Sequence, residues 1–482
     1  MAVDHQKTKE VLHWFEELSK IPRCSKNEAQ ICEWLTKWAG DNGFEVRRDR
    51  IQNVVIEVPG TAGYENSPGV VIQGHMDMVC EKAKGVDFDF SKDPIKLVYD
   101  GDWLTADQTT LGADNGIAIA MALTVALDKD SPHPPLELLF TVDEETGLTG
   151  ATELESGFIK GKFLLNVDSE DEGVFTVGCA GGKDTHLAVP VAEEALPGGS
   201  KGFKLVAGGM SGGHSGVDIH EQRANAIHVL TRALNELLKE LDVRIVALSG
   251  GTAHNAIPRD AEAVVALPAD KAGRAGALVG ELAAALRQEH GKTDPNITLI
   301  LEPAAASGTG LSAAGTRHAV DFLMAMPHGV ADMSLDIQGL VQTSNNLATL
   351  KLEGGKVITL TSQRSSVMNR LDWLTSRIEG AGRAAGGVAE TGGGYPAWQP
   401  NMDSPLLAKC VAVYKELFNK EPVVEIIHAG LECGIIGAKY EGMDMISFGP
   451  TIKNPHSPDE KLLVSTIGQV YDFMAALMKA LK

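Results

Sequence analysis

Basic residues are scarce in this chain. Its 482 residues include 43 lysines and arginines against 64 aspartates and glutamates, which gives a formal net charge of −21, and no basic run occurs. An acidic protein repels polyanions, so this composition argues against nucleic acid or an anionic membrane as the main partner. We interpret most of the negative charge as solvated surface.

Cysteines are few as well. They show neither the paired spacing of a zinc ribbon nor the density of a disulfide scaffold. We therefore expect reduced thiols at all six positions, which are Cys24, Cys32, Cys80, Cys179, Cys410 and Cys433.

Long apolar runs are absent. No run reaches the ~18–20 residues that are needed to span a bilayer. The opening segment, MAVDHQKTKEVLHWFEELSK, mixes both charges with apolar residues and lacks the separate apolar core of a secretory signal. The sequence therefore predicts a cytoplasmic protein.

Residues of the types that bind divalent metals recur along the chain, each after a strand-like segment or in the loop that follows. GVVIQGHMDMV, HPPLELLFTVDEETG and GKFLLNVDSED each predict a buried strand that ends at such a residue. In open α/β sheets, ligands bind at the carboxyl ends of the strands, so separate strands can supply one crevice. The mixture of imidazole and carboxylate suits two divalent ions. The five candidates are His75, Asp114, Glu145, Asp168 and His456.

Asp114 lies where a polar loop turns through Gly112 and enters the apolar helix of LGADNGIAIAMALTVAL. Taken alone, this aspartate would be interpreted as a helix cap, and His75 as a structural histidine. The ordered occurrence of all the motifs favours a metal site instead. Because helix N-termini stabilise negative charge, Asp114 can stay ionised while it bridges two cations.

Spacing within two motifs assigns further roles. In HMD, an extended backbone puts Asp77 on the same side as His75, where it can accept the second imidazole N–H. In DEETG, neighbouring side chains at a strand end point in opposite directions. We therefore assign Glu145 to the metal and Glu144 to proton transfer.

These motifs resemble the dinuclear-zinc exopeptidase family that contains carnosinases, glutamate carboxypeptidase and bacterial di- and tripeptidases, and in particular its branch that cleaves aminoacyl-histidine. The resemblance covers nearly the whole chain and depends on IPRCSKNE, GHMDMVCEK, LGADNGIAIA, FTVDEETGLTGA, LNVDSED, GGHSGVDIH, HNAIPRDA and HAGLECGIIG. Each motif is weak by itself, but the set is highly specific.

The resemblance implies two divalent ions, with zinc expected and cobalt or manganese as alternatives. One ion would be held by His75 and Asp168, the second by Glu145 and His456, with Asp114 between them. Glu144 would be the general base and Asp77 would orient the His75 ring. The Asn-Pro-His-Ser-Pro segment around His456 is equally typical of a plain turn, so the family pattern alone decides that assignment.

The resemblance also implies a lid over the site. His214 in GGHSGVDIH would stabilise the oxyanion, with His220 as a weaker alternative. Asn255 and Arg364 would hold the terminal carboxylate or backbone of the substrate, although an arginine after a strand is more often surface. Glu432 would meet the substrate's amino group.

Glycine-rich segments near residues 178–188 and 378–398 predict crossings between compact regions. The resemblance implies an α/β fold, with a mixed sheet flanked by helices in a catalytic domain formed by residues 1–183 and 394–482. Residues 184–393 would form an inserted α+β lid. At roughly 210 residues this lid is about twice the size of a simple small domain. It could be duplicated, although no sequence repeat is clear.

The predicted function is hydrolysis of a short peptide by a metal-bridging water with a glutamate as base. The resemblance implies that the substrate is an Xaa-His dipeptide such as β-alanyl-histidine. A tripeptidase or an amino-acid deacylase would use the same machinery. A metal-stabilised binding protein without turnover would leave Glu144 unexplained. A homodimer is compatible with the sequence, which leaves the oligomeric state open.

Overall fold

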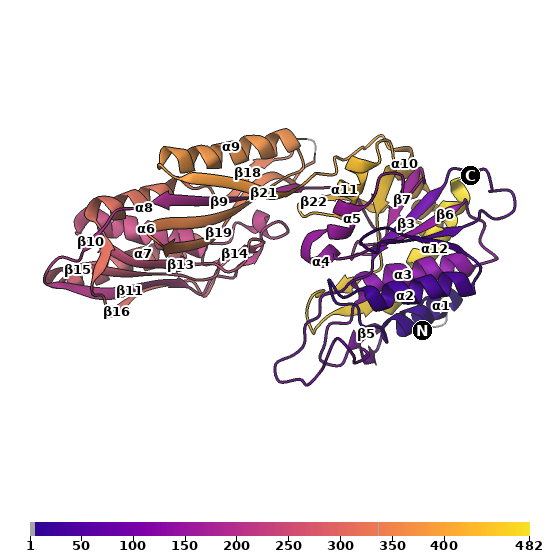
Figure 1. Ribbon diagram of the computed structural model, residues 1–482, viewed down its shortest axis with the longest axis horizontal. Coiled ribbons are helices and arrows are strands. Elements are labelled where there is room, and N and C mark those ends of the chain that lie inside the picture. Colours follow the sequence, from indigo (N-terminus) through magenta and orange to yellow (C-terminus); the bar gives the residue numbers. More distant parts are fainter. Residues whose placement is uncertain (1–4, 336) are drawn as a thin grey trace. The chain divides into compact units, whose positions relative to one another are not determined.

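The computed structural model describes residues 5–335 and 337–482, which form two compact units (Figure 1). The first unit comprises residues up to Cys179, Trp398–Ile426 and Leu431–Lys482, and the second comprises Ala180–Ala397 and Ile427–Gly430. The crossings thus lie four residues outside the expected 184 and 393. The sequence did not predict that the chain enters the second unit again at Ile427–Gly430. The end of a single strand carries no boundary signal in the sequence.

The first unit is built on an eight-stranded mixed sheet. Its four central strands β6, β3, β7 and β23 are parallel, and antiparallel strands extend it on both sides. The fully buried β3 explains the continuous apolar run in the sequence. The order across the sheet is β1 (Glu45–Arg48), β2 (Val54–Val58), β6 (Leu136–Thr141), β3 (Val70–His75), β7 (Phe163–Asn166), β23 (Asp444–Ser447), β8 (Val174–Cys179) and β22 (Val423–Ile427).

Helices cover this sheet. The almost wholly buried α3 (Ala113–Leu127) packs on β3 and against α1 (Gln6–Leu18), which explains why its sequence is apolar on every face. The last helix, α12 (Val464–Ala480), packs against α1 and α10 (Pro405–Phe418), so the two outer parts of the chain share one core. The unit also contains α2 (Ala29–Asp41), α5 (Thr149–Glu153), α11 (Glu432–Lys439) and a small sheet of β24 (Ile452–Lys453), β25 (Lys461–Leu463), β5 (Trp103–Ala106) and β4 (Leu97–Asp100).

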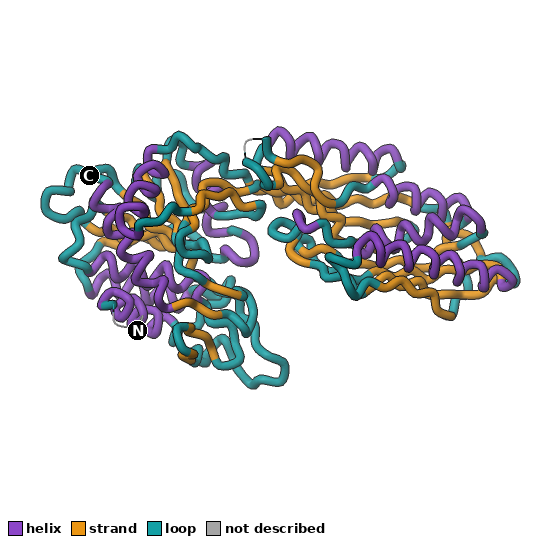
Figure 2. Tube along the Cα trace, turned by 180° about the vertical axis from the view of Figure 1, so that it is seen from behind, coloured by secondary structure: helices purple, strands orange, loops and turns teal. Residues whose placement is uncertain are grey.

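The second unit has a nine-stranded antiparallel sheet with four long helices (Figure 2). In one half of this unit the elements follow one another along the chain as β–α–β–β–α–β. Across the sheet, the four strands of this half lie in the order fourth, first, third, second. Its elements are β11 (Ser200–Gly208), α6 (Ala226–Glu240), β13 (Arg244–Gly250), β15 (Ala261–Pro268), α7 (Ala272–His290) and β16 (Thr298–Pro303).

The other half repeats this topology with the first half inserted after its first strand. It consists of β9 (Gly181–Pro190), α8 (Ala313–Ala325), β19 (Val341–Glu353), β20 (Lys356–Ser365), α9 (Met368–Ala384) and β21 (Val388–Tyr395). The halves join where β13 pairs with β19, the second strand of each. The insert is therefore a duplicated α+β domain, and the nesting of one copy inside the other separates the repeats in the sequence.

The expectation of six reduced cysteines is wrong for two of them. Cys24 and Cys80 form a disulfide, whereas Cys32, Cys179, Cys410 and Cys433 are free and buried. The segment around Cys24 pairs with the chain after β3 through a bridge between Cys24 and Met78. This tertiary contact brings the two thiols together, and no spacing rule reveals it.

No helix within the described residues is long and apolar enough to cross a membrane.

Candidate metal centre

The carboxyl ends of three parallel strands deliver side chains to one edge of the first sheet. His75 is the last residue of β3, and Asp168 lies two residues beyond the end of β7. Glu144 and Glu145 open α4 (Glu144–Gly147), which is separated from the end of β6 by Val142 and Asp143. Because β3 pairs in parallel with both β6 and β7, these residues emerge on the same edge.

Asp114 faces imidazoles with both of its oxygens. Its Oδ1 lies 3.1 Å from Nε2 of His75, and its Oδ2 lies 3.0 Å from Nε2 of His456. The aspartate stands in the first turn of α3, where it departs from helical geometry, and His456 has a left-handed φ of 59° in the loop after β24. The structure therefore places Asp114 between two histidines from opposite ends of the chain.

Each histidine also faces a second carboxylate. Nε2 of His75 is 3.5 Å from Oδ1 of Asp168, and Nε2 of His456 is 3.0 Å from Oε2 of Glu145. All five expected metal ligands thus meet in two sets that share Asp114.

The donor set fits divalent ions of the zinc type. Ligand atoms that bind one tetrahedral ion at about 2.0–2.2 Å lie about 3.3–3.6 Å apart. The histidine–carboxylate distances are 3.1 and 3.5 Å in the His75 set and 3.0 Å for both contacts of His456, so three of the four are a few tenths of an ångström shorter than this spacing. In addition, Oε1 of Glu145 is buried with no hydrogen-bond partner.

Ion pairs dominate the titration of this cluster. Burial alone would lower the pKa of His75, but its hydrogen bonds to Asp114 and Asp168 raise it well above the usual value. In the same way, Asp114 and Glu145 overcome burial and raise the pKa of His456 to about 11. A metal ion binds only neutral imidazoles, so metal binding at His75 and His456 would be coupled to the release of protons.

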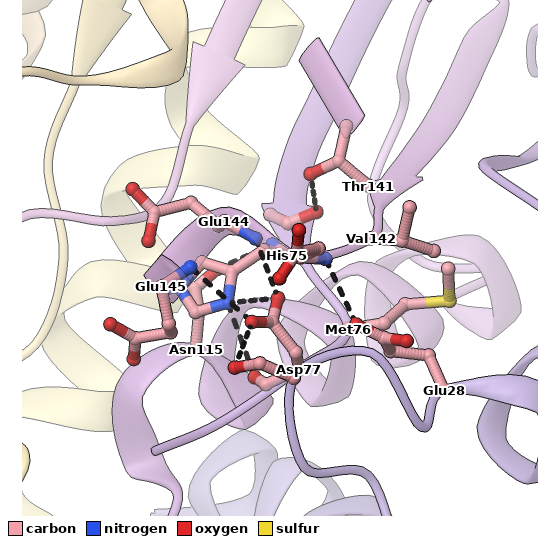
Figure 3. Close-up of polar contacts among 12 residues, drawn as sticks. Glu28, His75, Met76, Asp77, Asn115, Thr141, Val142, Glu144 and Glu145 are labelled. Carbon is pink, nitrogen blue, oxygen red and sulfur yellow. Dashed lines mark hydrogen bonds and ion pairs between the residues drawn. The ribbon is translucent and has the colours of Figure 1, made fainter. Parts of the chain in front are cut away.

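Asp77 supports the first ligand. It is fully buried, and its Oδ1 lies 3.3 Å from Nδ1 of His75. It also accepts a hydrogen bond from the Ser25 hydroxyl. The N–H groups of Glu144 and Glu145 donate to the same carboxylate (Figure 3). Although burial alone would raise the pKa of Asp77, the His75 contact and these donors lower it to about 2.

Glu144 and Glu145 differ from each other in environment. They belong to the short helix α4 rather than to a strand end, because Asp143 turns the chain with a left-handed φ of 49°. Their side chains still leave the backbone in different directions (Figure 3). Burial, followed by the nearby Asp168 and Glu145 charges, raises the pKa of Glu144 well above its usual value, against the lowering effect of His75.

Asn115 connects three ligand segments, a role that the sequence did not suggest. Its Oδ1 accepts the backbone N–H of His75 at 3.2 Å, and its Nδ2 donates to the carbonyl of Val167 at 2.7 Å. A Cβ on Gly74 would lie 2.4 Å from this Oδ1, so the glycine of QGH makes room for the contact. The Asp-Asn-Gly motif was the available signal.

A second acidic cluster, Glu28, Asp77 and Asp143, also has ligand atoms within metal-binding distance of one another. Each of its carboxylates already accepts hydrogen bonds. Glu28 accepts the N–H groups of Lys26 and Asp143, and Asp143 accepts the hydroxyls of Thr146 and Thr149. This cluster is therefore explained by hydrogen bonding.

Glu432 is fully buried at the start of α11 rather than on an open surface. Its Oε2 accepts Nε2 of Gln73 at 2.6 Å and the Thr141 hydroxyl at 2.7 Å, and its Oε1 has no partner. Burial raises its pKa to about 7, although His75 opposes the shift. A contact between Glu432 and a substrate amine remains a prediction.

Two of the expected lid residues lie on one ribbon in the second unit. β12 (Gly213–His214) pairs with β14 (Ala256–Ile257), so His214 stands opposite Ala256, next to the exposed Asn255. Nδ1 of His214 accepts the N–H groups of Gly216 and Val217. In a neutral ring the proton is then on Nε2, which makes that nitrogen a donor.

Arg364 is buried at the end of β20 in the second unit. Its guanidinium donates to the Tyr395 hydroxyl at 2.8 Å and to the Ser215 hydroxyl at 3.4 Å, while its Nε is buried without a partner. Among residues 5–335 and 337–482, no carboxylate lies within ion-pair distance of it. The sequence had left open whether this arginine is merely surface, and the structure buries it.

Residues 71–480 match the model of peptidase family M20/M25/M40. The chain belongs to this family. This M20 peptidase is 40% identical over 465 residues to the cytosol non-specific dipeptidase of Escherichia coli, with 96% of both chains covered. It also matches the crystal structure of an aminoacylhistidine dipeptidase from Vibrio alginolyticus with a TM-score of 0.87 and 40% identity, covering 100% and 99% of the chains.

A more distant structure, an aminopeptidase from Bacillus cereus, has a TM-score of 0.57 at 17% identity over 98% of both chains and shares the fold. The family match and the fold confirm the predicted α/β zinc-exopeptidase architecture. They also establish the chain as a metallopeptidase, a hydrolase that acts on peptide bonds.

Proposed function

We propose that this M20 peptidase is a dipeptidase that uses two divalent ions, with zinc as the expected metal and cobalt or manganese as alternatives. The observation that carries the proposal is the position of Asp114. Its two oxygens face two separate sets of ligands, one with His75 and Asp168 and one with His456 and Glu145. A carboxylate in this position can bridge two ions.

The ions would supply Lewis acidity, which lowers the pKa of water and polarises the scissile carbonyl. Glu144 takes the proton of the attacking water and transfers it to the leaving amine. The raised pKa of its buried carboxyl suits this role, because the group must bind a proton during the reaction. Asp77 holds the His75 ring through Nδ1 and keeps Nε2 directed at Asp114.

His214 would stabilise the developing oxyanion from the second unit. The two backbone N–H groups on its Nδ1 favour the tautomer that carries the proton on Nε2. A neutral N–H donor of this kind suits an oxyanion without the cost of burying a positive charge.

Arg364 would bind the terminal carboxylate of the substrate, and Asn255 would bind the backbone of the substrate. A buried guanidinium without an acidic partner is costly, and a substrate carboxylate would satisfy it with paired hydrogen bonds. Glu432 is assigned to the amino group of the substrate. Recognition of both the terminal carboxylate and the amino group would limit the substrate to two residues.

A preference for Xaa-His dipeptides, including β-alanyl-histidine, is supported by the name of the Vibrio alginolyticus relative. The name of the Escherichia coli relative supports a broader dipeptidase and a cytosolic location. Disulfides are unusual in reducing compartments, so the redox state of Cys24 and Cys80 in cells tests that location.

A hydrolysis screen tests the proposal. Metal-free protein is reconstituted with zinc, cobalt or manganese and given β-alanyl-histidine, other dipeptides, tripeptides and N-acyl amino acids, with chromatographic analysis of the products. We expect metal-dependent cleavage of dipeptides, with Xaa-His fastest. Faster cleavage of tripeptides or acyl amino acids would favour the tripeptidase or deacylase alternative, and no turnover on any substrate would reject the proposal.

A further inference from the structure

Glu460 places its carboxylate against the backbone of the loop that carries Asp114. One oxygen accepts the N–H groups of Leu111 at 2.7 Å and Gly112 at 2.9 Å. The other accepts those of Ala113 at 2.8 Å and Asp114 at 3.2 Å. The side chain is only 2% exposed, so these four bonds form away from solvent.

These four N–H groups belong to the start of α3, whose own N-cap, Gly112, supplies no capping side chain. Free N–H groups at a helix start need an acceptor, and the helix dipole favours a negative one. Glu460, which is 346 residues away in sequence from Asp114, fulfils this need. The backbone position of Asp114 therefore depends on a residue from the other end of the chain.

The same glutamate is tied to the loop of His456. Its N–H donates to the carbonyl of Ser457 at 3.0 Å, and its carbonyl accepts the Thr105 hydroxyl at 2.8 Å. One residue thus fixes the backbone on both sides of the contact between Asp114 and His456.

Arg23 supplies a buried positive charge beside this arrangement. Its guanidinium, 3% exposed, donates to the carbonyl of Gly112 at 2.5 Å and to those of Met76 and Asp77 at 3.2 and 3.0 Å. It therefore links the Asp114 loop to the segment just after His75. Cβ atoms on Gly112 or Gly116 would come within 2.6 Å of this guanidinium, so both glycines make room for it.

We propose that Glu460, supported by Arg23, is a positioning residue for the metal centre that sets the separation of Asp114 and His456. This inference rests on the proposed two-metal function. The positioning role requires a carboxylate at position 460, because four N–H donors need four lone-pair sites on two oxygens. A glutamine has an acceptor oxygen for only one pair of donors, and its NH2 would oppose the other pair.

The test is metal binding by Glu460→Gln, measured by titrating metal-free protein with cobalt(II) and recording its visible absorption. We expect the wild type to bind two equivalents and the variant to bind both at least 10-fold more weakly with an altered spectrum. We also expect kcat to fall at least 10-fold with KM within about twofold. Glu460→Asp keeps two acceptor oxygens on a shorter arm and should recover part of the affinity.

Asp444→Asn is the matched control. Asp444 also supports a helix start, because it accepts the Leu406 N–H and the Ser404 hydroxyl at α10, but it lies at the amino end of β23, away from the ligand edge. Its variant should lose stability and keep cobalt affinity.

Wild-type affinity and spectrum in Glu460→Gln would overturn the inference, as would equal losses in Asp444→Asn. If Glu460→Gln does not fold, Glu460→Asp decides by the same titration, and wild-type cobalt affinity there would reject the role. Failure of the wild type to bind cobalt would instead refute the proposed function.

Discussion

Asp114 and His456 are 342 residues apart in sequence, yet Oδ2 of the aspartate lies 3.0 Å from Nε2 of the histidine. The contact joins the start of α3 to the loop between β24 and β25. Because Asp114 also faces His75 through its other oxygen, a change at this aspartate affects both halves of the centre, whereas a change at His456 affects one.

Metal content should distinguish these two positions. We expect Asp114→Ala to lose both ions, because both sets of ligands share its carboxylate. His456→Ala should retain one ion, held by His75 and Asp168. Elemental analysis of protein dialysed against low-micromolar zinc measures the stoichiometry, and one ion in Asp114→Ala would contradict the bridging role.

Glu144→Gln should retain metal and lose turnover. General acid–base catalysis contributes about 10²–10⁴-fold, so kcat should fall by that factor while the metal content stays at two. The matched control is Glu145→Gln, one residue along, which contacts His456 and should lose metal. Dipeptide hydrolysis beside metal analysis checks both, and near-normal kcat in Glu144→Gln would exclude it as the base.

Arg364→Met should weaken substrate binding more than chemistry. Loss of a charge-assisted pair costs about 1.5–3 kcal/mol, so KM for dipeptides should rise about 10- to 150-fold. Dipeptide amides, which lack the terminal carboxylate, should be affected far less. Michaelis–Menten kinetics on paired acid and amide substrates provide the measurement, and equal losses on both would remove Arg364 from carboxylate recognition.

The second unit should become less stable in mild acid because of His328. Burial, followed by the neighbouring His228, lowers the pKa of His328 to about 3. Above pH 6.5 the ring is neutral in both folded and unfolded states and contributes nothing to the pH dependence. Between about pH 6.5 and 3 only the unfolded chain binds the proton, so the free energy of unfolding falls by up to about 1.4 kcal/mol per pH unit.

Urea unfolding at pH 7 and pH 5 measures this effect. We expect His328→Gln to reduce the difference between the two pH values, because a glutamine carries no titrating proton. His186→Gln, at an exposed position on β9, is the control and should keep the wild-type difference. An unchanged difference in His328→Gln would show that this ring does not govern the acid response.

Much of the fold could be predicted from local patterns. The strand predicted in GVVIQGHMDMV forms β3 at Val70–His75. The segment that follows Ser404 has helical apolar spacing and forms α10, with Ser404 as its N-cap. In the second unit, the segment AEAVVALP, which is rich in apolar residues and β-branched valines, forms β15, Ala261–Pro268. These elements form where predicted because side-chain periodicity and caps act over a few residues.

Parts of the site could not be predicted in this way. No sequence pattern near Glu460 predicts the four hydrogen bonds that its carboxylate accepts. Likewise, no pattern near Asn115 predicts the hydrogen bonds of its side chain to His75 and Val167. The disulfide of Cys24 and Cys80 and the complete burial of Glu432 were likewise not foreseen. All of these depend on segments that are distant in sequence.

The sequence by itself determined which side chains end each central strand, since a strand boundary and the residue after it are local properties. Only the tertiary structure decided that Asp114 stands between two histidines and that burial raises the pKa of Glu144. The physical reason is that distances between loops and the solvation of each charge arise from packing of the whole unit. No stretch of chain encodes them alone.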